Sequence, residues 1–437
     1  MPTLAGGNRA VPPNDTDTIE SSGQAEYPTQ PRKHAIVIMD GAADVPVPEL
    51  GHRTPLQVAD IPTIDWLAAR GRTGLMQTMY EGLPIGSIVA TIGILGYDPT
   101  QYYPRGRASF EALAQGLSLD DDDLILRCNL ISLDTECRIS DFTSNQISDQ
   151  DARAIIDGLR FADPRVEVYS GQSYRNLLIV RGVGCLAGQI ECYEPHTHIG
   201  VSVDDLMMRA LDERAAELVD DLNEMMRNSI DQIGRINDTR HTAADMIWLW
   251  SASCPPRMPG FTSRFGARGA VVAGLDFMRG IALAMGMQTS QIQGATGYLD
   301  TDLRQKLRYA RNYLQHNDVV VVHVNAPDEE AHLHRAANKV RAIERIDHEI
   351  VGPLLDFLNA NHSGHYRLAV LPDHTTRLSD GQHTADPVPY LIYGDGIAAD
   401  EVPGFDELTV GAATRQCLRS YDFMQVFLRM DHYAHPK

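Results

Sequence analysis

The sequence predicts an α/β protein whose mainly parallel sheet is flanked by helices, with a smaller α+β domain inserted into it. Short aliphatic and β-branched runs, such as those in HAIVIMDG and DVVVVHVN, are typical of parallel strands buried on both faces. Helical patterns alternate with these runs near both ends of the chain, as they do in βα units. From about residue 117, polar and apolar residues instead alternate in the manner of antiparallel strands.

The first strand is expected at His34–Met39. Residues 1–33 before it are rich in Pro, Thr, Ser, Asn and Gly, and we expect them to form a disordered tail. After the strand, an amphipathic helix is expected to begin near Ile64 and to end at Gly71. The segment PIGSIVATIGILGYDP predicts a loop that enters a helix of small residues, with Ser87 near the helix N-terminus.

Residues 117–241 are expected to form the inserted substrate-binding domain, and residues 34–116 and 242–437 the split core. The insertion has antiparallel strand patterns in LILRCNLISL, EVYSGQSYRNLLIVRG and QIECYEP, and a long polar helix is expected at Asp204–Asn228. In the second part of the core, the βα pattern predicts helices at Leu303–Leu314 and Ala336–Leu358 and strands at Asp318–Val324 and Arg367–Leu371.

Composition excludes several classes of partner. A formal net charge of −20 does not fit the basic stripe that nucleic-acid binding needs, although it allows a small phosphorylated substrate. No apolar stretch approaches the roughly 20 residues of a membrane span. The six cysteines lack C-x-x-C spacing, which favours a reduced chain, with a disulfide pair such as Cys185 and Cys192 as the alternative. We therefore expect a cytoplasmic protein that binds neither nucleic acid nor membrane; the sequence does not indicate an oligomeric state.

Potential metal ligands occur where three of the hydrophobic runs end, and ligands of open α/β sheets lie beyond the carboxyl ends of the strands. Each motif alone is weak: Asp328 and His332 could form a solvated turn, and Ser87 could simply be an N-cap. Their joint occurrence at strand ends favours one two-metal site. The predicted ligands are Asp40, Ser87, Asp328, His332, Asp373, His374 and His383.

Such a site suits phosphoryl transfer. Two cations about 3.5–4 Å apart can clamp the attacking and leaving oxygens of a displacement at phosphorus. A serine hydroxyl becomes a competent nucleophile when a cation lowers its pKa, and the free N–H groups of a helix N-terminus stabilise an anion bound there. We therefore expect Ser87 to be the catalytic residue that accepts the phosphoryl group.

The chain resembles the cofactor-independent phosphoglycerate mutases of the archaeal type, within the alkaline phosphatase superfamily. The resemblance is carried by segments along most of the chain, among them IVIMDGAAD, TPLQVADIPTIDWLAARGRTGLM, GRASFEALAQGL, SYRNLLIV, EPHTHIG, GATGYLDT, HVNAPDEEAH, PDHTT and HTADPVPYLIYG. It implies an alkaline-phosphatase-like core and the interconversion of 2-phosphoglycerate and 3-phosphoglycerate through a phosphoserine, a step of glycolysis. It also implies that no 2,3-bisphosphoglycerate is required.

The resemblance further implies roles for individual residues. Asp328, His332 and His383 would bind one divalent ion, and Asp40, Ser87, Asp373 and His374 the other, the ions being Mn, Mg, Zn or Co. Arg107, Arg127 and Arg175 would hold the phosphate and carboxylate of the substrate, although ordinary surface ion pairs are the alternative. For His196 and His198 in EPHTHIG we expect a structural role in the loop.

One departure from the family pattern concerns the substrate. In that pattern an acid follows the nucleophile and His or Asn comes four positions after it, whereas this chain has Ile88 and Thr91. The alternatives are therefore a phosphotransferase on another small hydroxy acid such as homoserine, a phosphatase or phosphonate hydrolase, and a metal-binding protein without turnover. A sulfatase is disfavoured because CPPRM at Cys254 does not fit C-x-P-x-R.

Overall fold

A computed structural model describes residues 32–184, 186–414 and 417–429 of the chain. Apart from Arg32 and Lys33, the predicted disordered tail lies outside the described residues. The expected first strand is present, and it begins at Lys33.

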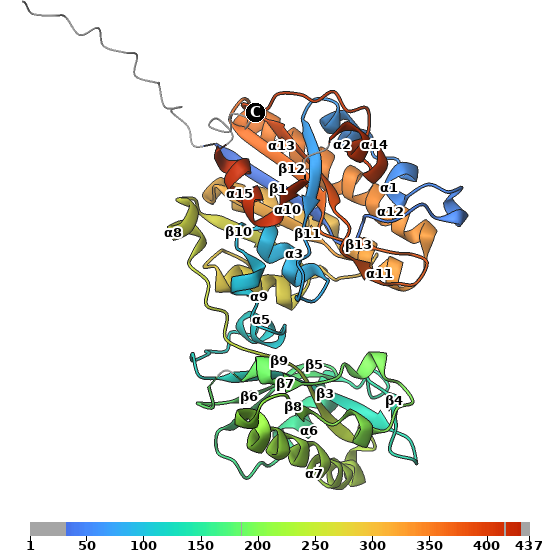
Figure 1. Ribbon diagram of the computed structural model, residues 1–437, viewed down its shortest axis with the longest axis vertical. Coiled ribbons are helices and arrows are strands. Elements are labelled where there is room, and N and C mark those ends of the chain that lie inside the picture. Colours follow the sequence, from blue (N-terminus) through green and yellow to red (C-terminus); the bar gives the residue numbers. More distant parts are fainter. Residues whose placement is uncertain (1–31, 185, 415–416, 430–437) are drawn as a thin grey trace, which may run out of the picture. The chain divides into compact units, whose positions relative to one another are not determined.

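A seven-stranded sheet forms the centre of the protein (Figure 1). Strand β15 runs antiparallel to both of its neighbours, β12 and β2, and the other pairings are parallel. The predicted α/β class with a mainly parallel sheet is therefore confirmed. In spatial order the strands are β10 (Gly269–Val272), β11 (Val319–Val324), β1 (Lys33–Met39), β12 (Tyr366–Pro372), β15 (Val388–Gly394), β2 (Arg72–Gln77) and β16 (Cys417–Arg419).

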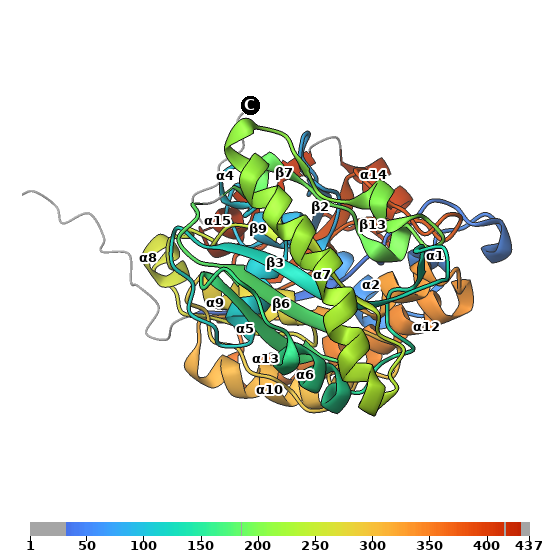
Figure 2. The same ribbon diagram turned by 90° about the horizontal axis from the view of Figure 1, so that it is seen from below.

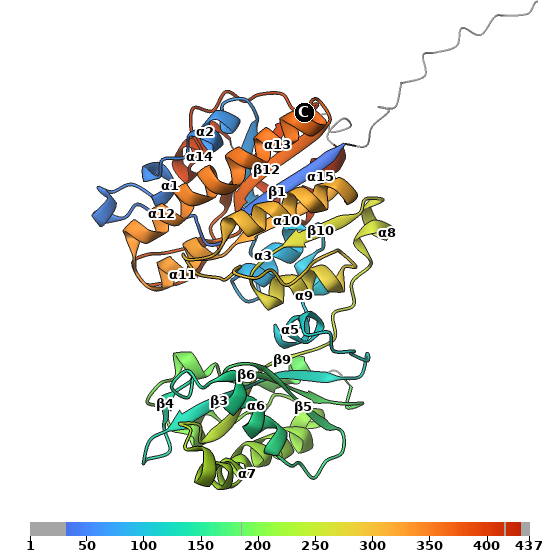
Figure 3. The ribbon, with the colours of Figure 1, turned by 180° about the vertical axis from the view of Figure 1, so that it is seen from behind.

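Helices cover both faces of this sheet because its strands carry apolar side chains on both sides. Ala35 and Val37 of β1 pack among helices on one face, drawn in front in Figure 3, and Ile36 and Ile38 pack on the other. The first face carries α1 (Pro55–Val58), α2 (Pro62–Ala68), α10 (Leu303–His316), α12 (Ala336–Ile346), α13 (Gly352–His362) and α14 (Glu407–Ala413). The second face carries α3 (Ser87–Ile94), α8 (Phe261–Phe265), α9 (Asp276–Ala284) and α15 (Ser420–Arg429).

A second, antiparallel sheet is built from the middle of the chain. Its strands are β4 (Ile139–Asp141), β3 (Leu124–Leu133), β6 (Arg175–Val180) and β5 (Val166–Gln172), with β9 (Met246–Ser253) also paired to β3. Helices α6 (Asp149–Gly158) and α7 (Ala216–Arg240) pack on one face, where Figure 2 shows α7 crossing the strands. Helix α5 (Ala108–Ala114) packs on the other face. The sheet takes in β9, which follows the predicted end of the insertion at residue 241.

The predicted helix at Asp204–Asn228 is wrong in its first part. Residues Val203–Leu206 form a 3₁₀ turn, and β8 (Arg209–Ala210) pairs with β7 (Ile190–Glu191) before α7 begins. The side chain of Asp212 accepts a hydrogen bond from the backbone N–H of Arg214 and so starts a new helical turn there. Apolar spacing alone does not reveal such a break, because Leu206 is buried in the same core as the helix that follows.

The remaining elements are short. They include α4 (Pro99–Tyr102), α11 (Ala326–His332), β13 (Thr375–Thr376) and β14 (His383–Thr384), and a π-helical turn, Asp347–Val351, joins α12 to α13. No helix in the described part of the chain is long and apolar enough to cross a membrane. Cys128, Cys137, Cys192 and Cys417 are free, but the expectation of a fully reduced chain is wrong for Cys254, which is disulfide-bonded. Sequence spacing could not show this, because it does not reveal which cysteines meet in the fold.

Two helical glycines provide a test of packing. A Cβ at Gly280 of α9 would lie 1.8 Å from the backbone oxygen of Phe110 in α5, whereas a Cβ at Gly234 of α7 would meet nothing within 4 Å. We expect Gly280→Ala to lower the free energy of unfolding by about 1–3 kcal/mol, because the two helices must separate. Gly234→Ala should instead raise it by up to about 1 kcal/mol. Urea unfolding measures both, and equal stability of the two variants would contradict the close approach of α5 and α9.

Candidate metal centre

The predicted metal ligands meet at one edge of the central sheet. Strands β11, β1 and β12 are adjacent and in register, with Met39 of β1 opposite Val324 of β11 and Pro372 of β12. Because the three strands are parallel, the residues that follow them emerge side by side. Asp40 follows β1 directly, Asp373 follows β12 directly, and Asp328 lies in the first turn of α11, just after β11.

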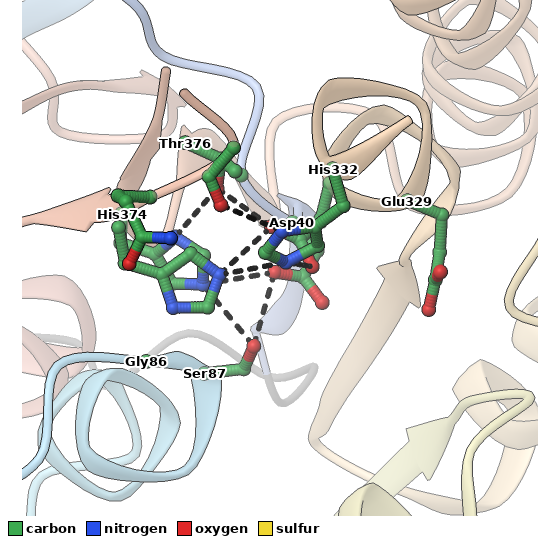
Figure 4. Close-up of polar contacts among 12 residues, drawn as sticks. Asp40, Gly86, Ser87, Glu329, His332, His374 and Thr376 are labelled. Atoms are coloured by element: carbon green, nitrogen blue, oxygen red, sulfur yellow. Dashed lines mark hydrogen bonds and ion pairs between the residues drawn. The ribbon is translucent and has the colours of Figure 1, made fainter. Parts of the chain in front are cut away.

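The other predicted ligands reach the same edge from different elements. His332 is the last residue of α11. His383 begins β14, which pairs with β13 opposite Thr376 and leads into the antiparallel β15. Ser87 is the first residue of α3, as predicted. All seven predicted residues are thus brought together, and Figure 4 labels four of them, Asp40, Ser87, His332 and His374.

One group of contacts centres on Ser87. Its Oγ donates a hydrogen bond to Asp40 Oδ1 at 3.1 Å and lies 3.2 Å from His374 Nε2. The same nitrogen lies 3.2 Å from Asp40 Oδ1 and 3.7 Å from Asp373 Oδ2. Asp40, Asp373 and His374 are fully buried. They each present one ligand atom, and these atoms all lie within 4.8 Å of one another.

A second group centres on Asp328. Its Oδ2 lies 3.3 Å from His332 Nε2, and its Oδ1 lies 3.2 Å from His383 Nε2. The two groups adjoin, because the rings of His374 and His383 have centroids 4.2 Å apart. Asp328, His374 and His383 form a further set of ligand atoms within 4.8 Å of one another. His374 therefore lies between the two groups that the sequence predicted as separate ligand sets.

The histidine tautomers fit a metal centre. His332 Nδ1 lies 2.8 Å from the carbonyl oxygen of Gly381, and His383 Nδ1 lies 3.2 Å from that of Ile85. Each Nδ1 must therefore carry the proton, which leaves the Nε2 atom of a neutral ring with a bare lone pair. These two Nε2 atoms are only 3.1 Å apart. Two lone pairs at that distance repel each other, and a cation bound by both removes the repulsion.

The carboxylates fit a cation equally well. Burial and the neighbouring Asp40 raise the pKa of Asp373 to about 7. Burial and Asp328 also oppose ionisation of Asp40, but contacts with His323 and His374 lower its pKa to about 2. Oδ2 of Asp40 and Oδ2 of Asp373 are buried and accept no well-aligned hydrogen bond from the described part of the chain, although His323 Nε2 lies 3.3 Å from the first and His374 Nε2 lies 3.7 Å from the second. Unsatisfied buried carboxylate oxygens beside bare imidazole nitrogens are a donor set suited to a divalent ion.

Sequence reasoning missed several residues around the centre. Thr376 Oγ1 donates to Asp328 Oδ1 at 2.6 Å and lies 3.1 Å from His374 Nδ1. The buried His323 places Nε2 3.3 Å from Asp40 Oδ2, and the buried Lys306 donates to the carbonyl oxygen of His323. A histidine within a valine run was a visible signal for His323. Lys306 and Thr376 gave none, because a lysine in an amphipathic helix and a threonine after a turn are ordinary.

The three predicted substrate arginines surround a buried carboxylate beside the second sheet. Glu111 of α5 lies 2.9 Å from Arg107 Nε and 3.0 Å from Arg127 Nε. Burial would raise the pKa of Glu111, but Arg127 and Arg107, with a smaller contribution from Arg175, lower it. The Arg127 guanidinium also stacks on Trp250, 4.5 Å from the ring centroid.

Aromatic and loop residues border this cluster. Arg175 is exposed and stacks 4.4 Å from the ring centroid of Tyr174. In the EPHTHIG segment, His196 pairs with Glu194 at 3.1 Å, and His198 Nδ1 lies 2.9 Å from the Glu194 carbonyl oxygen. Both contacts are local, but the ring of His196 also lies 5.7 Å from that of Trp250, on which Arg127 stacks.

The two departures from the family pattern lie on α3 beside Ser87. Ile88 packs against the apolar cluster beneath the sheet. Thr91 is fully buried, and its hydroxyl donates to the sulfur of Met278 at 3.5 Å. Neither side chain brings an ionisable group to Ser87.

Comparison with known proteins gives one consistent result. Residues 68–235 match the family model described as 2,3-bisphosphoglycerate-independent phosphoglycerate mutase. A relative of that name from Methanothermobacter thermautotrophicus is 40% identical over 403 residues, which cover 91% of this chain and 97% of the relative.

Solved structures agree with the sequence relatives. A protein from Pyrococcus horikoshii shares 25% identity with a TM-score of 0.75, over 93% of this chain and 99% of its own. The cofactor-independent phosphoglycerate mutase from Thermoplasma acidophilum shares 26% identity with a TM-score of 0.61, over 91% of this chain and 99% of its own. This chain therefore belongs to the family of 2,3-bisphosphoglycerate-independent phosphoglycerate mutases.

Proposed function

We propose that the protein interconverts 2-phosphoglycerate and 3-phosphoglycerate by metal-dependent phosphoryl transfer through a phosphoserine at Ser87. The observation that carries this proposal is the position of Ser87 Oγ, at the first residue of α3 and 3.1 Å from Asp40 Oδ1. The family's name supports the substrate and the reaction. The two departures on α3 leave both ligand groups intact, so they do not argue against metal-dependent phosphoryl transfer.

Two divalent ions, of Mn, Mg, Zn or Co, are proposed to complete the site. Asp328, His332 and His383 would hold one, and Asp40, Ser87, Asp373 and His374 the other. When bound, the ions would lower the pKa of the Ser87 hydroxyl and neutralise charge that develops on the phosphoryl oxygens.

The side chains of the protein would perform the remaining tasks. Ser87 Oγ would take the phosphoryl group from one hydroxyl of the substrate and return it to the neighbouring one. Asp40 accepts the hydrogen bond from Ser87 and so orients its oxygen. No side chain of the described residues caps the N-terminus of α3, and its first N–H groups would bind the phosphoryl oxygens.

The arginine cluster is proposed to bind the substrate. Arg107, Arg127 and Arg175 together carry more positive charge than Glu111 neutralises, and Arg107 and Arg175 are accessible to solvent. Guanidinium groups bind carboxylate and phosphate bidentately. We propose that these residues and the second sheet form the substrate-binding domain, which would retain the intermediate glycerate while it turns between the two transfers.

Removing the nucleophile should abolish turnover. We expect Ser87→Ala to lower kcat for the conversion of 3-phosphoglycerate by at least about a thousandfold, because no other group replaces the nucleophile. Ser263→Ala, at an exposed position of α8, is the matched control and should keep wild-type activity. Radiolabelled phosphoglycerate should label the wild type and not Ser87→Ala. Release of inorganic phosphate without isomerisation would favour a phosphatase, and labelling of Ser87→Ala would refute the assignment.

The negative charge of Asp373 should destabilise the metal-free protein but strengthen metal binding. In metal-free protein, the raised pKa of Asp373 means that its contribution to stability is lost as the pH rises through about 7. We expect Asp373→Asn to stabilise the metal-free protein at pH 8 relative to wild type, and to lower Mn²⁺ affinity by at least about tenfold. Asp356→Asn, on the exposed face of α13, should change neither.

Urea unfolding at pH 5 and pH 8, with and without Mn²⁺, measures both effects. Saturating Mn²⁺ should stabilise the wild type by about 2.7 kcal/mol per site at a hundredfold excess over Kd. Fewer than two ions bound per wild-type chain would contradict the paired site. A less stable Asp373→Asn at pH 8 without metal would contradict the charge argument alone.

The arginine cluster should control substrate affinity. We expect Arg175→Gln to raise KM for 3-phosphoglycerate about ten- to a hundredfold, because one charge-assisted hydrogen bond is lost. Mn²⁺ stoichiometry should stay unchanged, since Arg175 belongs to the second sheet. Arg153→Gln, at an exposed position of α6, is the matched control. An unchanged KM would remove Arg175 from the proposed substrate site.

A further inference from the structure

The hydroxyl of Thr376 lies between the two ligand groups and contacts one member of each. Its Oγ1 is 2.6 Å from Asp328 Oδ1, in the group with His332 and His383. The same oxygen is 3.1 Å from His374 Nδ1, in the group with Ser87 (Figure 4). Thr376 is fully buried, so water does not compete for either contact.

The direction of these hydrogen bonds follows from their chemistry. The ionised carboxylate of Asp328 can only accept, so the single hydroxyl proton of Thr376 must point to it. The hydroxyl oxygen then accepts from His374, which must carry its proton on Nδ1. His374 Nε2, which faces Ser87 and Asp40, is then the nitrogen that would give up its proton to bind a cation. One hydroxyl thus orients a carboxylate in one group and selects the imidazole tautomer in the other.

The backbone holds Thr376 in place from the opposite side. Its carbonyl oxygen accepts a hydrogen bond from Lys339 Nζ at 2.7 Å. Lys339 is itself fixed by Asp44 Oδ2 at 2.8 Å and by the carbonyl oxygen of Ala43 at 3.1 Å. These partners are not ligands, so Thr376 is held by groups that do not depend on a cation.

Gly41 lies against the Thr376 hydroxyl, and no side chain would fit at its position. Gly41 has a φ of +60°, and a Cβ there would lie 2.5 Å from both Thr376 Oγ1 and Asp328 Oδ1. A glycine is therefore needed for the hydroxyl and the carboxylate to meet. The close approach of Gly41 confines the Thr376 hydroxyl to the position from which it reaches both ligands.

We propose that Thr376 is a positioning residue that couples the two metal sites. This inference rests on the two-metal centre of the proposed function and adds a residue outside its ligand set. The hydroxyl does not bind a cation; it aligns Asp328 for one ion and His374 for the other. Loss of the hydroxyl should therefore weaken both sites together, whereas loss of a single ligand weakens mainly its own.

Three variants test this coupling by Mn²⁺ titration in a calorimeter. Thr376→Val removes the hydroxyl at nearly constant volume and should weaken Mn²⁺ binding about ten- to a hundredfold at both sites. Thr376→Ser keeps the hydroxyl and should bind within about threefold of wild type. Thr78→Val is the matched control, because Thr78 is equally buried and its hydroxyl has no hydrogen-bond partner in the described chain. It should bind Mn²⁺ like wild type.

The outcomes separate this inference from the proposed function. If the wild type binds two ions and Thr376→Val binds them equally tightly, the coupling role is overturned and the two-metal centre stands. Wild type that binds fewer than two ions overturns the two-metal centre itself. If Thr376→Val does not fold, ¹⁵N-histidine NMR of Zn²⁺-loaded wild type decides: protonation of His374 on Nδ1 is expected, and protonation on Nε2 overturns the proposal.

Discussion

Three carboxylates buried at one edge of a parallel sheet are the constraint on which the rest of the structure depends. Asp40, Asp328 and Asp373 emerge from neighbouring strands, and like charges in a poorly solvated interior repel strongly. The buried lysines nearby do not neutralise them. Lys339 is paired with Asp44, and burial lowers the pKa of Lys306 to about 7. Burial would lower the pKa of His374, but Asp373 and Asp40 raise it to about 10, so a proton on His374 offsets part of this charge. Divalent cations, as proposed for the centre, would replace that proton and offset the rest.

The antiparallel direction of β15 matters for the same site. A parallel strand has its C-terminal end at the edge where the carboxylates lie, whereas β15 has its N-terminal end there. The β13–β14 hairpin that precedes it therefore sits over the centre, and it carries His383 on one strand and Thr376 on the other. Reversing a single strand thus brings a proposed ligand, His383, and its neighbour Thr376 to the centre without any further element.

Much of this arrangement could be predicted because it follows from local patterns. The runs before Asp40, Asp328 and Asp373 are too apolar for anything but buried strands, and parallel strands bring their ends together. What could not be predicted depends on contacts between distant segments. The carboxyl group of Glu111 gathers arginines from separate strands, and Thr376 gains its role only from the placement of Asp328 and His374. Likewise, the break before α7 depends on the pairing of β7 with β8.

The apolar surface of α3 limits where acid–base assistance can arise. Thr91 is buried and Ile88 is a half-buried apolar residue, so at these two positions the helix that presents Ser87 offers no ionisable side chain. The ionisable groups in contact with Ser87 Oγ are Asp40 and His374. A proton that leaves Ser87 must therefore pass toward the carboxylate edge of the sheet. On the proposed assignment, nucleophile activation and metal binding would draw on the same few side chains, and a change to Asp40 or His374 would alter both at once.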